Sequence, residues 1–121
     1  MAKYQIVPSF WGPYTKVNFG LSPFTPNPLR RALLVDATPP GGGGEVEIIL
    51  PTPYDGLIIL ITDEFALSSS NSILVTPTGV GVKVPDLLHP GAYIAGPTAI
   101  QNNLGVGLQF ILADNQWIRW A

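Results

Sequence analysis

Apolar runs of strand length alternate with turn sequences from residue 45 onward. Residues 45–50 (EVEIIL) alternate between polar and apolar positions and then become fully apolar. Residues 57–62 (LIILIT) form a continuous aliphatic run, which is typical of a strand that is buried on both faces. The intervening sequence PTPYDG predicts a turn, and its strongest signal is the pair Asp55-Gly56.

The rest of the chain continues this pattern. A polar loop at 63–72 and a turn at 87–91 separate further apolar runs, which predict strands at 73–77, around 82–84 and at 92–96. Residues 105–113 and 117–120 are expected to pair as a terminal hairpin across 114–116. Short strands with turns roughly every 8–12 residues predict an all-β fold, a small antiparallel β-sandwich or barrel of jelly-roll-like form.

Residues 1–45 differ from the rest because prolines recur every few residues between aromatic residues. Proline is disfavoured in helix interiors and central strands, so we expect an extended N-terminal arm that lies against a protein surface. Its aromatic residues are Tyr4, Phe10, Trp11, Tyr14, Phe19 and Phe24. Residues 29–36 fit a short helix or a strand equally well. The glycines before Glu45 form a joint, which divides the chain into an arm (1–45) and a β-sandwich module (46–121).

The last strand contains two of the three tryptophans of the chain, Trp117 and Trp120. Side chains alternate across a strand, so these two residues point to opposite faces. One interpretation is that the strand lies between its own core and a neighbouring chain, which would bury both indoles. The other is that Trp120 simply folds over the edge of its own domain.

Charged residues make up only 12% of the chain, with six basic and eight acidic residues and a net charge of -2. This composition argues against a nucleic-acid partner, which selects basic surfaces. The longest aliphatic run is far shorter than the ~20 residues of a spanning helix, so no membrane segment is predicted. The N-terminal sequence has no secretory apolar region, and synthesis in the cytoplasm of the host cell is expected. A sparsely charged surface is consistent with contacts to partner proteins.

The residues that carry chemistry form no recognisable catalytic, cofactor or metal motif, and we expect no enzyme and no cofactor. His89 is the only histidine and lies in a turn sequence without a nucleophile motif. Asp63 and Glu64 are adjacent, which places their side chains on opposite sides of an extended chain. The glycines at 41–44 lack the Lys-Ser/Thr that follows them in a phosphate-binding loop.

The part from Gly56 to Trp120 resembles a β module of bacteriophage virion proteins, namely head decorations, head fibres and tail fibres. The sequences that carry the resemblance are GLIILITDEFALSSSNSILVTP and FILADNQWIRW. The residues that match the family pattern are Asp63, Asn71, Ile73, Val75, Pro77, Asp114, Asn115 and Trp117. The chain departs from the pattern at Glu64-Phe65-Ala66, where the family often has a glycine, and it ends soon after the module instead of continuing into a fibre.

The resemblance implies a structural virion protein that decorates the capsid surface as a homotrimer. Such a decoration (cement) protein would bind between subunits of the major capsid protein and stabilise the shell. Residues expected at the capsid or trimer interface are Phe10, Trp11, Tyr14, Phe19, Phe24, Trp117 and Trp120. The alternative is a tail-fibre or tail-base component that binds a glycan, because aromatic side chains stack on sugar rings.

Overall fold

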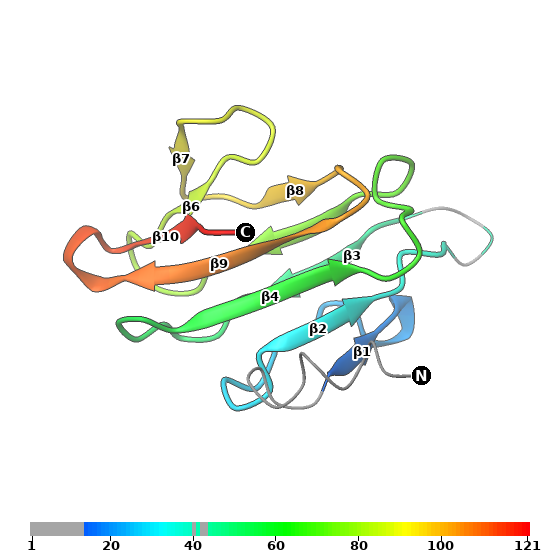
Figure 1. Cartoon of the computed structure of the whole chain (residues 1–121), viewed down its shortest axis with the longest axis horizontal. Coiled ribbons are helices and arrows are strands. Elements are labelled where there is room, and N and C mark those ends of the chain that lie inside the picture. The colour runs from blue at the N-terminus through cyan, green and yellow to red at the C-terminus, as the bar shows by residue number, and fades with distance from the viewer. Residues whose placement is uncertain (1–13, 40, 42–43) are drawn as a thin grey trace.

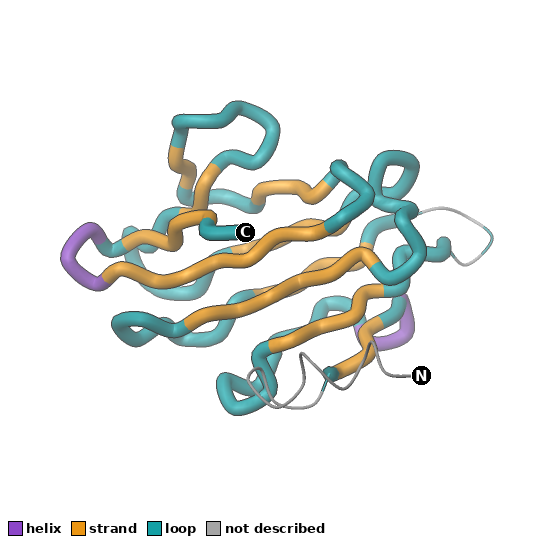
Figure 2. The backbone as a smooth tube through the Cα atoms, in the orientation of Figure 1, coloured by secondary structure: helices purple, strands orange, loops and turns teal. Residues whose placement is uncertain are grey.

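The computed structural model describes residues 14–39, 41 and 44–121, whose regular secondary structure is almost entirely β-strand (Figures 1 and 2). The strands are β1 Thr15–Val17, β2 Ala32–Val35, β3 Val46–Ile49, β4 Ile58–Asp63, β5 Ile73–Thr76, β6 Val84–Pro85, β7 Tyr93–Ile94, β8 Thr98–Ile100, β9 Gly105–Ile111 and β10 Gln116–Arg119. Two 3-10 turns, η2 (Phe19–Leu21) and η3 (Leu112–Asp114), complete the described elements. The prediction of an all-β fold is confirmed.

The strands form a sandwich of a five-stranded and a three-stranded sheet, with a small hairpin beside them. The large sheet has the order β1-β2-β4-β9-β10, the small sheet has the order β3-β5-β8, and β6 pairs with β7. Figure 1 shows the large sheet in front, with β3 behind it. The strand directions differ from the antiparallel arrangement predicted, because β1–β2, β2–β4 and β3–β5 are parallel pairs.

The core lies between the two sheets and follows the alternation of side chains along each strand. In β4, Ile59 and Ile61 are fully buried, whereas Ile58 and Leu60 on the opposite face are half-buried. The small sheet contributes Val46, Ile48, Ile73, Val75 and Ile100 to the same hydrophobic cluster. Burial of such aliphatic side chains is the main favourable contribution to folding, at roughly 25 cal/mol per Å² of apolar surface.

The described residues before the glycines are part of this sandwich. Residues 29–36, which fit a helix or a strand, contain strand β2, where Leu33 and Val35 are completely buried. Between β1 and β2 the chain reaches the other sheet, where the backbone N–H of Phe24 donates to the Glu47 carbonyl at 2.9 Å. Two strands of the large sheet therefore come from the segment that the sequence analysis assigns to the arm.

The predicted terminal hairpin forms between β9 and β10. Asn115 closes its turn in the left-handed conformation (φ 51°), and its backbone N–H donates to the Leu112 carbonyl. Across the hairpin, Trp117 pairs with Phe110, and their rings meet edge to face with centroids 5.5 Å apart. Both residues are buried in the core, so the first of the two tryptophans is shielded by its own chain.

The polar loop after β4 is organised by Asp63, whose side chain is 5% exposed. Its carboxylate accepts hydrogen bonds from the backbone N–H groups of Leu67 (3.1 Å) and Ser68 (2.7 Å). The Ser68 hydroxyl in turn accepts a hydrogen bond from the Asn103 backbone N–H at 2.9 Å. The carboxylate that matches the family pattern thus holds the loop, and it is not available to a ligand.

Candidate functional site

The outer face of the large sheet is the most apolar surface that the strands present. We define the outer face as the positions whose side chains point away from the small sheet: Lys16, Ala32, Leu34, Ile58, Leu60, Thr62, Gly105, Gly107, Gln109, Ile111, Gln116, Ile118 and Trp120. Lys16 is the one charged residue among these positions, and it lies on the edge strand and pairs with Glu64 at 3.1 Å. A β-sheet face with this composition is typical of a surface that contacts protein.

Trp120, which follows the edge strand β10, and Gly107 of β9 lie opposite each other on this face. The Trp120 backbone N–H donates to the Gly107 carbonyl (3.0 Å), and the Gly107 N–H donates to the Ala121 carbonyl (3.1 Å). A Cβ on Gly107 would lie 3.0 Å from Cε2 of the Trp120 indole, so the ring lies over the glycine. The indole keeps 42% of its surface exposed. Trp120 therefore folds over its own sheet and still presents a large apolar surface outward.

Exposed apolar side chains also gather on the loops at the two ends of the sandwich. At one end, Leu112 and Val80 lie on neighbouring turns. The Leu112 backbone N–H donates a hydrogen bond to the Asp55 carboxylate, and the Asn115 side-chain amide donates one to the Val80 carbonyl. Val80 is completely exposed. At the other end, Phe65 and Leu104 are exposed on two loops. A hydrogen bond joins these loops, in which the Asp63 backbone N–H donates to the Leu104 carbonyl (2.9 Å).

The residues predicted at an interface are distributed over different environments. Phe10 and Trp11 lie outside the described residues. Phe19 and Phe24 pack against the core of their own chain, and Tyr14 is half-buried before β1. Trp117 is fully buried and cannot contact a partner in the folded chain, whereas Trp120 can.

Sequence reasoning missed the aliphatic residues of the outer face, above all Ile58, Leu60 and Ile118. Their signal was the continuous aliphatic run of β4, which predicts burial on both faces, and the apolar content of β10, for which burial by a neighbouring chain was one of two interpretations. In the single chain these residues are only half-buried.

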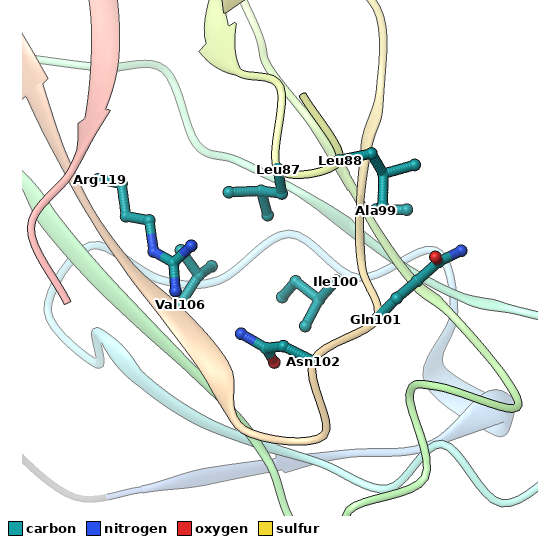
Figure 3. A pocket seen from close by; sticks show the side chains of 8 residues that line it. All are labelled: Leu87, Leu88, Ala99, Ile100, Gln101, Asn102, Val106 and Arg119. Carbon is teal, nitrogen blue, oxygen red and sulfur yellow. The ribbon is translucent and has the colours of Figure 1, made fainter. Parts of the chain in front are cut away.

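A cavity of about 300 Å³ opens at the seam between the two sheets (Figure 3). It is lined by Leu87, Leu88, Ala99, Ile100, Gln101, Asn102, Val106 and Arg119. The turn that follows β6 and the strand β8 both contribute residues to its lining. One hydrogen bond, from the Leu87 N–H to Thr98 Oγ1 (2.9 Å), joins this turn to β8. A second cavity of about 160 Å³ adjoins the first and shares Leu87 and Arg119 with it.

Arg119 and Asn102 are the polar groups that face each other across this cavity (Figure 3). Arg119 lies on the same face of β10 as Trp117, which directs it toward the seam. Its Nε donates to the Ala121 carbonyl at 3.1 Å. Asn102 is held by hydrogen bonds from the backbone N–H groups of Leu104 and Gly105 to its Oδ1, both at 2.8 Å.

Asp86 and His89 form the acid–imidazole contact beside the second cavity, with Oδ2 and Nδ1 3.0 Å apart. Partial desolvation raises the pKa of Asp86, but hydrogen bonds from His89 and from the Leu88 N–H outweigh it and hold this pKa below its usual value. The His89 side chain is largely exposed. The Asp86 carboxylate also accepts a hydrogen bond from the Leu88 backbone N–H within the same turn, which accounts for the pair as a turn-stabilising contact.

Within the part of the chain that the structure describes, no three His, Cys, Asp or Glu side chains are grouped closely enough to hold a metal ion. In that same part, no helix has the length and apolarity to cross a membrane. No model of a known protein family matches the chain, and a search among curated proteins finds no match either. What the chain does must therefore be inferred from its own surfaces.

Proposed function

We propose that this chain is a non-enzymatic structural protein of a bacteriophage particle, a capsid decoration (cement) protein that acts as a homotrimer. The observation that supports this proposal best is the apolar outer face of the five-stranded sheet, with Leu60 on β4, Ile118 on β10 and Trp120 directly after β10. In a monomer this face would be in contact with water. In a trimer, each copy would cover the outer face of a neighbour or pack it around a common axis.

The size of the sheet suits such a contact. A stable protein interface buries about 800 Å² on each partner, and its centre is depleted in charge and enriched in aromatic residues. The outer face extends over five strands and has a single lysine at its margin. A sheet face whose one charged residue lies on an edge strand, with an aromatic residue at the opposite edge, is suited to such an interface.

The exposed loop residues supply a second surface for the capsid. Val80 and Leu112 are exposed on neighbouring turns at one end of the sandwich. The aromatic residues Phe10 and Trp11, which lie outside the described residues, are proposed as further anchors on the major capsid protein. A protein that binds only the assembled shell stabilises it by mass action, in proportion to its occupancy.

The experiment measures solution mass and shell binding on the same preparation. Light scattering should give about three times the 12.9 kDa of one chain. The protein should also sediment with purified capsids of the phage that encodes it. The double substitution Phe10→Ala and Trp11→Ala should weaken sedimentation with capsids and leave the trimer mass unchanged. A monomer at all concentrations, or no sedimentation of the wild-type protein with capsids, would reject the proposal.

A second candidate is a tail-fibre or tail-base component that binds a glycan. The observation that favours it is the seam cavity, where Gln101, Asn102 and Arg119 offer hydrogen-bonding groups near the exposed ring of Tyr93. This function predicts binding to immobilised glycans and location of the protein in the tail. Electron microscopy of virions labelled with an antibody to the protein separates the two: label on the head supports decoration, and label on the tail supports the alternative.

A further inference from the structure

We infer that residues 4–7 of one copy add as a further strand to the free edge of β8 in a neighbouring copy, with the side chain of Ile6 in the seam cavity. This inference rests on the proposed function, because it requires the homotrimer. β8 is the last strand of the small sheet, and Figure 1 shows it along the upper margin of the sandwich. The strand edge borders the cavity, since Ala99, Ile100 and Gln101 belong to the lining.

The free edge of β8 presents the backbone N–H and C=O groups of Ala99. The Leu50 N–H donates to the Thr76 carbonyl (2.8 Å), so the backbone groups of Thr76 face β3. Backbone groups alternate between the two edges of a strand, so those of Val75 face β8, where Val75 pairs with Thr98. Ala99 follows Thr98 and therefore directs its backbone groups away from β5. Such outward N–H and C=O groups are a template for another strand, which is why we infer a peptide as the occupant.

The other sheet edges are covered by the chain itself or carry a charge. At β3, the Ile49 N–H donates to the Phe24 carbonyl (2.8 Å), and at the start of β10 the Trp117 N–H donates to the Lys83 carbonyl (2.9 Å). The edge strand β1 carries Lys16, and a lysine on an edge strand disfavours pairing with another chain. The three residues of β8 are uncharged. Strand addition is therefore expected at β8.

The sequence of residues 4–7, which lie outside the described residues, fits this edge. Tyr-Gln-Ile-Val contains three residues that favour strands, and Pro8 limits the strand on its C-terminal side. Side chains alternate along a strand, so Tyr4 and Ile6 share one face and Gln5 lies on the other. With the larger apolar pair directed inward, Ile6 would contact apolar residues of the cavity lining, namely Leu87, Ile100 and Val106.

A neighbouring copy supplies this segment more readily than the same chain does. Residues 8–14 connect it to β1, and seven residues span at most about 24 Å. β1 forms one edge of the large sheet, whereas β8 lies toward the other edge, where Val106 of β9 and Arg119 of β10 share its cavity. A direct path between them would cross the core, and Pro8 and Pro13 restrict any folding back of the connection.

An engineered disulfide tests the contact, because the chain has no cysteine. Gln5→Cys and Ala99→Cys place two thiols on opposite residues of the added pair, where Cα atoms about 5.5 Å apart allow a disulfide. Under mild oxidation, the double variant should form covalent dimers and trimers on a denaturing gel. The control pair is Gln5→Cys with Val80→Cys, at a completely exposed loop position, and it should cross-link about tenfold less. A disulfide within single chains, or equal cross-linking of the two pairs, would overturn the inference.

Hydrogen exchange tests the same contact without cysteines. The Ala99 amide should be protected in the wild-type protein, and Ile6→Asp, which places a charge in the apolar seam, should speed its exchange about tenfold or more. Val7→Asp is the matched control, because Val7 points outward, and it should leave the rate unchanged. The Ile100 amide, which faces β5, should exchange slowly in all three proteins. Rapid exchange at Ala99 in the wild-type protein, or equal effects of the two aspartates, would contradict strand addition.

Light scattering of the reduced samples separates this inference from the proposed function. A four-residue strand is too small to hold copies together alone, since a stable interface buries about 800 Å² on each partner. The outer face must therefore supply the main contact, and the strand adds to it. A trimer that forms no cross-link between positions 5 and 99 rejects the strand addition and leaves the homotrimer standing, whereas a monomer rejects both.

Discussion

The indole of Trp120 lies over Gly107 of the neighbouring strand, so closely that a Cβ on the glycine would be 3.0 Å from Cε2 of the ring. The two residues are cross-strand neighbours, joined by a hydrogen bond from the Trp120 N–H to the Gly107 carbonyl. An aromatic ring that covers a cross-strand glycine shields backbone that would otherwise face water, and it adds packing to a position without a side chain. The pair makes a flat apolar area on the outer face.

Substituting Gly107 with valine should displace the Trp120 indole into solvent. Valine favours strands, which offsets the lost ring contact, so the free energy of unfolding should change by less than about 1 kcal/mol. Tryptophan fluorescence should shift to longer wavelength, and the shift should be absent in a Trp120→Phe background. Gly96→Val is the matched control, because a Cβ there meets nothing within 4 Å. An unchanged emission spectrum would mean that the indole does not rest on the glycine.

Gly105 is expected to tolerate no side chain. It has a φ of 126°, and a Cβ would overlap the Ile61 carbonyl oxygen and lie 2.9 Å from Thr62 Cα, both in the rigid backbone of β4. Gly105→Ala should lower the free energy of unfolding by about 3 kcal/mol or more. Gly91 also has a positive φ (96°) but open space around it, so Gly91→Ala should cost only about 1–2 kcal/mol of backbone strain. Urea unfolding of both variants measures the difference, and equal losses would contradict the clash.

Removing the Asp63 carboxylate should destabilise the loop after β4. Asp63→Ala leaves the backbone N–H groups of Leu67 and Ser68 without acceptors in a mostly buried site, at an expected cost of about 2–4 kcal/mol. The comparison variant is Asp36→Ala. The Asp36 carboxylate accepts an exposed hydrogen bond from the Thr38 backbone N–H, so its removal should lower the free energy of unfolding by less than about 1 kcal/mol. Thermal unfolding measures both variants. Similar losses for the two would show that the buried hydrogen bonds contribute little.

The Asp86–His89 contact predicts a defined pH dependence. The folded pKa of Asp86 is lowered from its ordinary value of 3.8, so the stability that this carboxylate contributes is fully present above pH 3.8. That stability is lost as the pH falls further, through the lower folded pKa. His89→Ala removes the main hydrogen bond that favours the charged form, and the Asp86 pKa should rise toward the ordinary value. Carbon-13 NMR titration of the carboxyl group reports this pKa directly. If the wild-type protein and His89→Ala give the same titration curve, the lowered pKa of Asp86 is due to the backbone amides alone.

The strands that the sequence predicted best are those with long apolar patterns. The runs at 57–62 and 105–113 became β4 and β9, and the hairpin to β10 formed as expected. The short strands β1 and β8 were missed, because three residues beside prolines carry no readable period. Their pairing depends on tertiary packing, which a local pattern does not record.

Strand direction and the candidate site were harder to predict for a related reason. β2 and β4 are parallel neighbours because β3, which lies between them in sequence, belongs to the other sheet. No local signal marks such a crossing. Likewise, the run in β4 indicates that both of its faces are apolar, but it does not indicate whether its own chain or a partner covers the second face.

The outer face provides the most direct test of the proposed assembly. Ile118→Lys places a charge beside Gln109 on a half-buried position, where the long side chain can still reach water in a monomer. In a trimer that buries this face, the same charge would lose its hydration, so the mass in solution should fall from three chains to one. The folded structure should persist, with a loss of less than about 1 kcal/mol in the free energy of unfolding of the monomer. Val80→Lys adds the same charge at a fully exposed loop and should leave the mass unchanged. If Ile118→Lys is folded and keeps the mass of the wild-type protein at equal concentration, the outer face is not the contact between copies. The exposed apolar residues on the loops at the two ends of the sandwich would then be the next surface to test.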